Sequence, residues 1–232
     1  MHVIHRAAQV GDFGTLRRLL AEGVSVDTRS YCGLTPLHRL CIGNATSGDA
    51  EVCFRLLRDA GANLEATEGD AGAVPLHYAA AKRNNLASLL IEAGVKVNVA
   101  HSYGTTPLHD AAKKGSETTV AILVKAGAAV NVKDGWGKRP LHYARDYNPR
   151  VCHILLRAGA SLVNYYYYAG TPSPFCEPTT SQYLQRVTDA GGFKEYEQAH
   201  LAKLTSTCAS KFSLPAAPAR LVAEFWAHAG YY

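Results

Sequence analysis

Thr35-Pro36-Leu37-His38 is the stretch that decides the fold, because similar tetrapeptides recur along much of the chain. The recurrences are Val74-Pro75-Leu76-His77, Thr106-Pro107-Leu108-His109 and Arg139-Pro140-Leu141-His142, and an eroded copy, Val3-Ile4-His5, opens the chain. The five histidines stand 33, 39, 32 and 33 residues apart. A period of this length indicates a solenoid of stacked structural repeats.

A second marker keeps the same period. A glycine followed by valine or alanine comes after each leucine-rich stretch, at spacings of 38, 33, 33 and 32 residues. These glycines are Gly23, Gly61, Gly94, Gly127 and Gly159. Two independent markers with one period predict that each repeat is one supersecondary unit, which buries its apolar faces only when it is stacked on its neighbours.

Local chemistry explains each part of the unit. Thr35 and Thr106 are predicted to cap the first helix, and the following prolines suit its first position, where the missing N–H costs nothing. Apolar residues at helical spacing, such as Val120 and Leu123, predict a second helix. The marker glycine then ends that helix in a left-handed conformation. A short extended piece leads to a hairpin turn with a glycine such as Gly104.

The chain resembles the ankyrin-repeat family through this T-P-L-H signature, over residues 2–163. The resemblance implies an all-α ankyrin-repeat solenoid, in which the signature histidine hydrogen-bonds backbone between repeats. We expect five repeats over residues 1–163. Extra Gly, Asn and Ser residues predict a loop insertion near residues 43–48, between the two helices of the second repeat.

The remaining residues are harder to assign. We interpret residues 164–192 as a degenerate sixth repeat, whose first helix Pro174 and Pro178 disrupt. Residues 193–232 form a predicted helical extension, with one helix over 193–212 and another over 220–228. One interpretation is a C-terminal cap for the last repeat. The other is a short box that recruits a ubiquitin ligase, as some ankyrin proteins have.

Composition excludes several classes of protein. The net charge of +5 comes with no basic run or recognition-helix pattern, so nucleic-acid binding is not expected. No apolar stretch is long enough to enter a membrane, and no secretory signal is visible. The six cysteines form no C-x-x-C pair, which favours reduced thiols. We therefore expect a cytoplasmic or nuclear location, with the interior of an organelle as the alternative.

Catalytic chemistry is not expected. Five of the ten histidines belong to the signature, and the others match no nucleophile, phosphate-binding or metal motif. Cys152 and His153 are adjacent, but neighbouring residues on a helix do not face each other. We predict no catalytic residue, no cofactor and no metal. An unrecognised enzyme is kept as a remote alternative.

A protein partner is the expected ligand. In the family, hairpin tips and first helices line a concave face where binding specificity usually lies. Mapped onto this chain, the candidate residues are Tyr31, Asp70, Tyr103, Trp136, Lys82, Lys113, Lys114 and Tyr147. Tyr103 and Trp136, on successive tips, are predicted to be neighbours and to anchor the partner. Lys113 and Lys114 are predicted to steer an acidic segment of it.

Three functions follow in order of preference. The first is a non-catalytic adaptor or structural subunit, either a monomer or part of a hetero-complex. The second is a ubiquitin-ligase substrate receptor, and the third is an enzyme. Asn98 and Asn131 also resemble hydroxylation targets of some ankyrin proteins, although a structural role in the turn between repeats is preferred.

Overall fold

The computed structural model describes residues 2–69, 71–82, 85–144, 149–161 and 185–212. Their regular secondary structure is helical, with no strand among them. The chain divides into two compact units, residues 1–161 and residues 162–232. The first unit carries the repeats. The observed architecture is the all-α solenoid that the sequence predicts.

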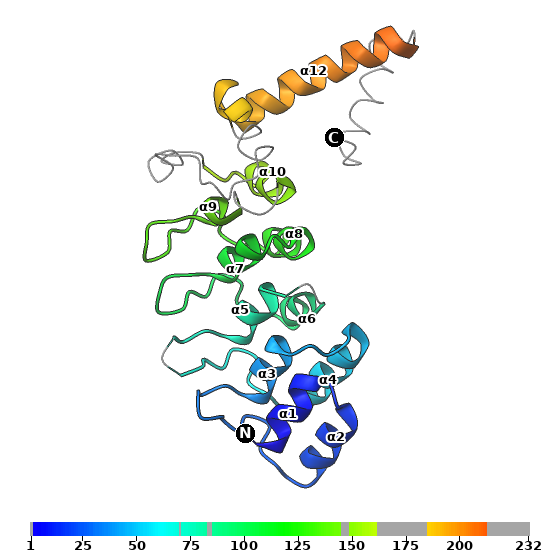
Figure 1. Cartoon of the computed structure of the whole chain (residues 1–232), viewed down its shortest axis with the longest axis vertical. Coiled ribbons are helices and arrows are strands. Elements are labelled where there is room, and N and C mark those ends of the chain that lie inside the picture. The colour runs from blue at the N-terminus through cyan, green and yellow to red at the C-terminus, as the bar shows by residue number, and fades with distance from the viewer. Residues whose placement is uncertain (1, 70, 83–84, 145–148, 162–184, 213–232) are drawn as a thin grey trace. The chain divides into compact units, whose positions relative to one another are not determined.

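Pairs of antiparallel helices build the first unit (Figure 1). The pairs are α1 (Val3–Val10) with α2 (Phe13–Ala21), α3 (Pro36–Ile42) with α4 (Ser47–Asp59), α5 (Pro75–Ala80) with α6 (Leu86–Glu92), α7 (Pro107–Lys114) with α8 (Glu117–Lys125), and α9 (Pro140–Ala144) with α10 (Pro149–Arg157). The first helices of the pairs contact one another in an inner column, and the second helices form an outer column. Loops at 22–35, 60–74, 93–106 and 126–139 lead from each outer helix to the next inner helix, and we call them fingers.

The inner helices begin as the signature predicts, with one correction. A proline fills the first helical position of α3, and the Thr35 hydroxyl accepts a hydrogen bond from the His38 N–H at 3.5 Å. The prediction that the Thr106 hydroxyl caps α7 in the same way is wrong. That hydroxyl lies 2.8 Å from His109 Nδ1, as the Thr35 hydroxyl lies 2.9 Å from His38 Nδ1, and the Thr106 N–H donates to the same ring nitrogen at 3.1 Å.

The outer helices end at the marker glycines, as predicted. These five glycines have φ between 82° and 86°, a left-handed conformation that L side chains rarely adopt. The N–H of the next residue donates a hydrogen bond back to a carbonyl of the last helical turn. One example runs from the Ala128 N–H to the Leu123 carbonyl at 2.9 Å. This bond satisfies a carbonyl that the helix end leaves without a partner.

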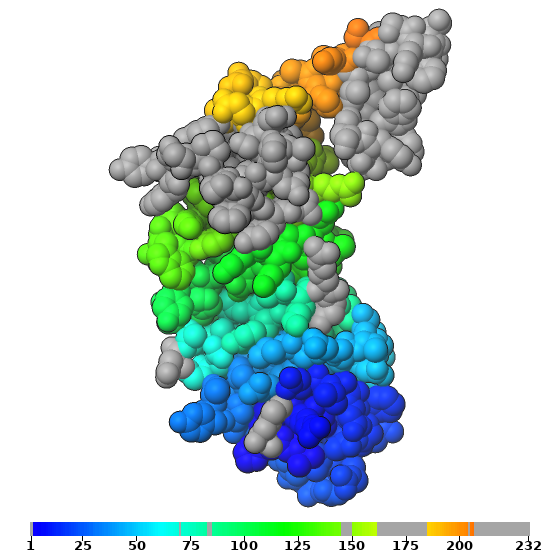
Figure 2. All heavy atoms as spheres, viewed as in Figure 1, coloured from blue at the N-terminus to red at the C-terminus, as the bar shows by residue number. Residues whose placement is uncertain are grey.

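Leucine and alanine side chains between the two columns form the core. The signature leucines, such as Leu76 and Leu108, are about 1% exposed, and each stabilises the fold by about 2 kcal/mol through burial. Ala79, Ala80 and Ala111 are fully buried, and their small side chains let inner helices approach closely. The space-filling view shows successive repeats in contact (Figure 2).

The insertion in the second repeat differs from the prediction. Thr46 caps α4, so Ser47 and Gly48 already belong to this helix of 13 residues, and the loop covers only 43–46. The loop packs on the end of α1, where a Cβ added to Gly43 would lie 2.0 Å from the Gln9 carbonyl oxygen. The last two residues of the predicted loop therefore belong to the helix, because the Thr-x-x-Asp sequence is an N-cap.

In the second unit, α12 (Phe193–Phe212) has the bounds that the sequence predicts. Residues 185–189 are helical and end with a bond from the Gly192 N–H to the Val187 carbonyl at 3.0 Å. Gly191 therefore takes the left-handed position, with φ 91°. The rest of the predicted sixth repeat and the 220–228 helix lie outside the described residues, so both stay predictions.

Candidate partner-binding site

The signature histidines tie each repeat to the next. The N–H of the residue three positions earlier donates to Nδ1, for example Val74 to His77 at 3.2 Å, so Nε2 carries the ring proton. That Nε2–H donates to the carbonyl of Thr105 in the next repeat at 3.0 Å. The Nε2–H groups of His5, His38 and His109 donate in the same way to a carbonyl of the next repeat, at 2.9, 3.1 and 3.2 Å.

Burial keeps these rings neutral. It is the main cause that lowers the pKa of His38 and His109, and it lowers the pKa of His77 to about 4. Protonation would also place a hydrogen on Nδ1, against the backbone N–H that already points at it. These histidines have the structural role that the family resemblance implies.

A second set of hydrogen bonds joins the repeats at the turns that follow the outer helices. The Asn98 amide donates to the Gly127 carbonyl at 3.1 Å and accepts from the Ala129 N–H at 2.7 Å. Asn131 makes the same pair of bonds to Gly159 and Ser161, at 2.9 and 2.8 Å. Both amides therefore hold the turns between repeats. Their hydroxylation stays a prediction.

Backbone bonds join the finger tips and set their spacing. The Ser102 N–H donates to the Ala71 carbonyl and the Gly135 N–H donates to the Tyr103 carbonyl, both at 2.8 Å. Gly104 has φ 72°, and a Cβ there would lie 3.0 Å from the Gly135 nitrogen. The last fingers are thus closely packed, which fixes the side chains at their tips.

Tyr103 and Trp136 are neighbours, as predicted. Their rings stack with centroids 5.8 Å apart and an interplanar angle of 17°. His101 packs edge-on against the Tyr103 ring at 5.6 Å and accepts the Tyr103 N–H on Nδ1 at 3.1 Å. Even so, Tyr103 is 57% exposed and Trp136 is 58% exposed. The stack is therefore a preorganised aromatic surface with its outer area open to solvent.

The other candidate residues are dispersed. Tyr31 stands fully exposed on the first finger, and Lys82 lies 3.5 Å from the Asn44 side chain. Lys113 and Lys114 are both exposed at the end of α7. Asp70 and Tyr147 lie outside the described residues. The structure thus joins Tyr103 to Trp136 and Lys113 to Lys114, and it leaves Tyr31 apart.

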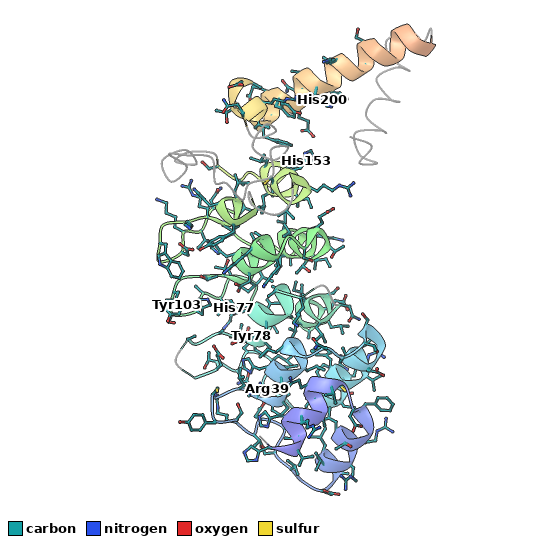
Figure 3. All side chains as sticks on the ribbon, in the orientation of Figure 1. Arg39, His77, Tyr78, Tyr103, His153 and His200 are labelled. Carbon is teal, nitrogen blue, oxygen red and sulfur yellow. The ribbon has the colours of Figure 1, made fainter. Side chains whose placement is uncertain are left out.

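Sequence reasoning missed a column on the inner helices. The residue after the signature histidine is Arg39 in α3, Tyr78 in α5, Asp110 in α7 and Tyr143 in α9. Arg39 and Tyr78 are labelled on successive inner helices in Figure 3. Tyr78 and Tyr143 pack edge-on against the signature histidine of the preceding repeat, at 5.9 Å in both cases. The position after histidine in each tetrapeptide was the available signal.

Carboxylates border this column. The Tyr143 hydroxyl donates to Asp134 Oδ2 at 2.6 Å, and Lys138 Nζ lies 5.5 Å from the Tyr143 ring centroid. Burial, followed by the neighbouring Glu68, raises the pKa of Tyr78. Burial likewise raises the pKa of Asp110 to about 7. We call the finger tips together with this column and the α7 lysines the concave face.

The described residues contain no cluster of three histidine, cysteine or acidic side chains that could hold a metal ion. Cys41 and Cys53 are buried, and burial raises their pKa values to about 12 and about 11, so neither is a ready nucleophile. No helix in the part of the chain that the structure describes has the length and apolar character of a membrane span.

Comparison with known proteins gives the family. The model for ankyrin repeats (3 copies) matches residues 4–101, 44–134 and 96–165. Among curated relatives, the chain is 36% identical over 118 residues to the nuclear factor NF-kappa-B p105 subunit of Gallus gallus, which is 49% of this chain and 12% of the relative. It is 33% identical over 119 residues to the human transient receptor potential cation channel subfamily A member 1, which is 50% of this chain and 10% of the relative.

A third relative is the ankyrin repeat and SOCS box protein 3 of Bos taurus, 32% identical over 105 residues, which is 44% of this chain and 19% of the relative. The chain spans less than a fifth of the length of each of these three relatives. The family match covers the helix pairs, the signature histidines and the fingers described above. The chain belongs to the ankyrin-repeat family, which is generally non-catalytic and whose repeats mediate the binding of protein partners.

Proposed function

We propose that this chain is a non-catalytic interaction module that holds a protein partner on its concave face, as an adaptor or as a subunit of a larger assembly. The stacked Tyr103 and Trp136 rings are the observation that carries the proposal. Aromatic side chains on rigid, exposed loops are the usual anchors of protein interfaces. Free thiols in the core, such as Cys41 and Cys53, favour a reducing compartment such as the cytoplasm or nucleus.

The Tyr103 and Trp136 rings are preorganised for binding. Tyr103 and Trp136 are held by the bond between their tips and by their mutual stacking, so little side-chain freedom remains to be lost on binding. Each still presents more than half of its surface to solvent. A partner that covers both rings gains apolar burial at about 25 cal/mol per Å², without first ordering them.

Charge supports an acidic partner segment. Lys113 and Lys114 are exposed on adjacent positions of α7. Paired exposed cations raise the rate at which an acidic segment meets the surface, more than they raise the final affinity. The lysines therefore steer, and the aromatic pair anchors.

The test is a pull-down from native extract with the whole chain as bait. Proteins that wild type retains should be lost when Tyr103 and Trp136 are both changed to alanine. Phe13→Ala is the matched control, because it removes an exposed aromatic side chain of the outer helix α2, away from the concave face. Equal recovery with all three baits would exclude the aromatic pair as the anchor.

The similarity to an ankyrin repeat and SOCS box protein favours a second candidate, a ubiquitin-ligase substrate receptor. In this case the repeats would select the substrate and residues 193–232, which include α12, would contact the ligase. Deletion of residues 193–232 separates the two functions. A receptor should lose co-purifying ligase subunits and keep its substrate, whereas an adaptor should keep every partner that wild type binds.

A further inference from the structure

Asp110 is the acidic member of the inner-helix column. It lies in the first turn of α7, directly after His109, where the neighbouring repeats carry Tyr78 and Tyr143. The charge of Asp110 acts on both tyrosines, so the carboxylate lies close to each of them. Asp110 is partly buried in this wall of the concave face.

The Asp110 carboxylate has no hydrogen bond or ion pair with any residue that the structure describes. The Tyr143 hydroxyl is already committed to Asp134. Burial is the main cause that raises the pKa of Asp110 to about 7, against the opposing charges of Lys113 and Lys114. At neutral pH the Asp110 side chain is therefore present in comparable amounts as the neutral acid and as the carboxylate.

Helical spacing puts this acid beside the steering lysines. Lys113 and Lys114 follow Asp110 by three and four residues, so the three side chains share one face of α7. A partner carboxylate that pairs with the lysines therefore arrives next to Asp110. An ionised Asp110 would oppose that carboxylate, and a neutral Asp110 would not.

We propose that Asp110 makes the binding of an acidic partner segment to the concave face depend on a proton. The neutral acid accepts the segment beside Lys113 and Lys114, and the ionised carboxylate repels it. Binding then takes up a proton from solution and weakens as the pH rises through neutrality. The inference rests on the proposed function, because it concerns the same concave site.

Other titratable and charged groups face α7 from the surrounding elements. Those whose charge acts on Asp110 or on the adjacent His109 are Tyr78 of α5, Tyr143 of α9, and His101 and Asp134 of the fingers. Burial lowers the pKa of His101 and His109, so both rings are neutral near pH 7. Burial raises the pKa of Tyr78 and of Tyr143, so both hydroxyls keep their protons. An Asp110→Asn variant separates the contribution of Asp110 to the pH dependence of binding from the contributions of these other groups.

The experiment titrates tetramethylrhodamine-labelled hexaglutamate with the whole chain and follows fluorescence anisotropy at about pH 6 and about pH 8. Wild type should bind about fivefold more weakly at the higher pH, if the bound peptide raises the pKa of Asp110 from about 7 by about one unit. Asp110→Asn should bind at the higher pH about as tightly as wild type binds at the lower one. If the pH dependence is the same in both proteins, the role of Asp110 is overturned.

Two further variants keep this failure distinct from failure of the proposed function. Changing Lys113 and Lys114 to alanine should weaken hexaglutamate binding at both pH values, because this probe offers the surface nothing but negative charge. Changing Arg17 and Lys125 of the outer helices to alanine removes the same charge and should leave binding intact. If both pairs weaken binding equally, or if wild type does not bind, the inference and the steering role of the lysines are overturned, whereas the pull-down with the Tyr103 and Trp136 variant decides the proposed function.

A direct titration removes dependence on the variants. Carbon-13 NMR of the side-chain carboxyl in the free wild-type chain should show Asp110 titrating near pH 7. Titration of Asp110 near the ordinary aspartate pKa of about 4 would overturn the inference, whatever the peptide data show.

Discussion

Replacing His77 by asparagine should destabilise the chain at neutral pH and much less in acid. The asparagine oxygen can take the place of Nδ1 and accept the Val74 N–H, but nothing replaces the Nε2–H that donates to the Thr105 carbonyl. Both His77 and Thr105 are buried, so this carbonyl loses its partner away from water. The expected cost near pH 7.5 is about 1–3 kcal/mol.

The pH dependence follows from the histidine itself. Burial lowers the pKa of His77 from 6.5 to about 4, so the folded chain binds this proton less readily than the unfolded chain. The stabilisation is complete above pH 6.5 and is lost as the pH falls towards 4. At about 1.4 kcal/mol per pKa unit, wild type loses about 2 kcal/mol at pH 5 through this one group, a loss that the variant does not share.

Urea unfolding of both proteins, followed by far-UV circular dichroism at about pH 7.5 and about pH 5, measures this difference. The gap in unfolding free energy between wild type and His77→Asn should shrink by about 2 kcal/mol in acid. Taking a difference cancels the other titrating groups, including Asp110, whose raised pKa has the opposite effect on stability. A gap in unfolding free energy that stays constant within about 0.5 kcal/mol would refute the conclusion that burial keeps His77 neutral in the folded chain.

Two further predictions concern the joints between repeats. Asn98→Ala should lower the unfolding free energy by about 1–2 kcal/mol, because it removes both hydrogen bonds to the next repeat. Asn98→Asp should lower it less, because the carboxylate can still accept the Ala129 N–H. Equal losses in urea unfolding would argue against the acceptor bond. Gly104→Ala should cost about 1–2 kcal/mol from its positive φ, plus a term for its contact with Gly135. Gly127→Ala is the matched control, since its φ is 85° and no atom lies near the added Cβ. If the two alanine variants unfold at the same urea concentration, the close approach of the tips adds nothing.

The aromatic pair shows what sequence reasoning can reach at a candidate site. Tyr103 and Trp136 hold equivalent places on successive fingers, so the repeat period alone makes them neighbours. Their 17° stacking angle and their remaining exposure depend on the tip-to-tip backbone bond, which the period does not describe. The length of α4 was missed for another reason: composition suggested a loop, but a local cap at Thr46 starts a helix.

The bounds of most helices follow from local features of the sequence. Proline at the first helical position and glycine in a left-handed turn restrict the backbone locally, and the repeat period multiplies that restriction along the chain. Only the tertiary structure decided which side chains share the concave face. Tyr78, Asp110 and Tyr143 are about one repeat apart in sequence, and stacking of the inner helices brings them together. The unusual state of Asp110 arises from that packing, because burial and missing partners are properties of neighbours that no local sequence contains.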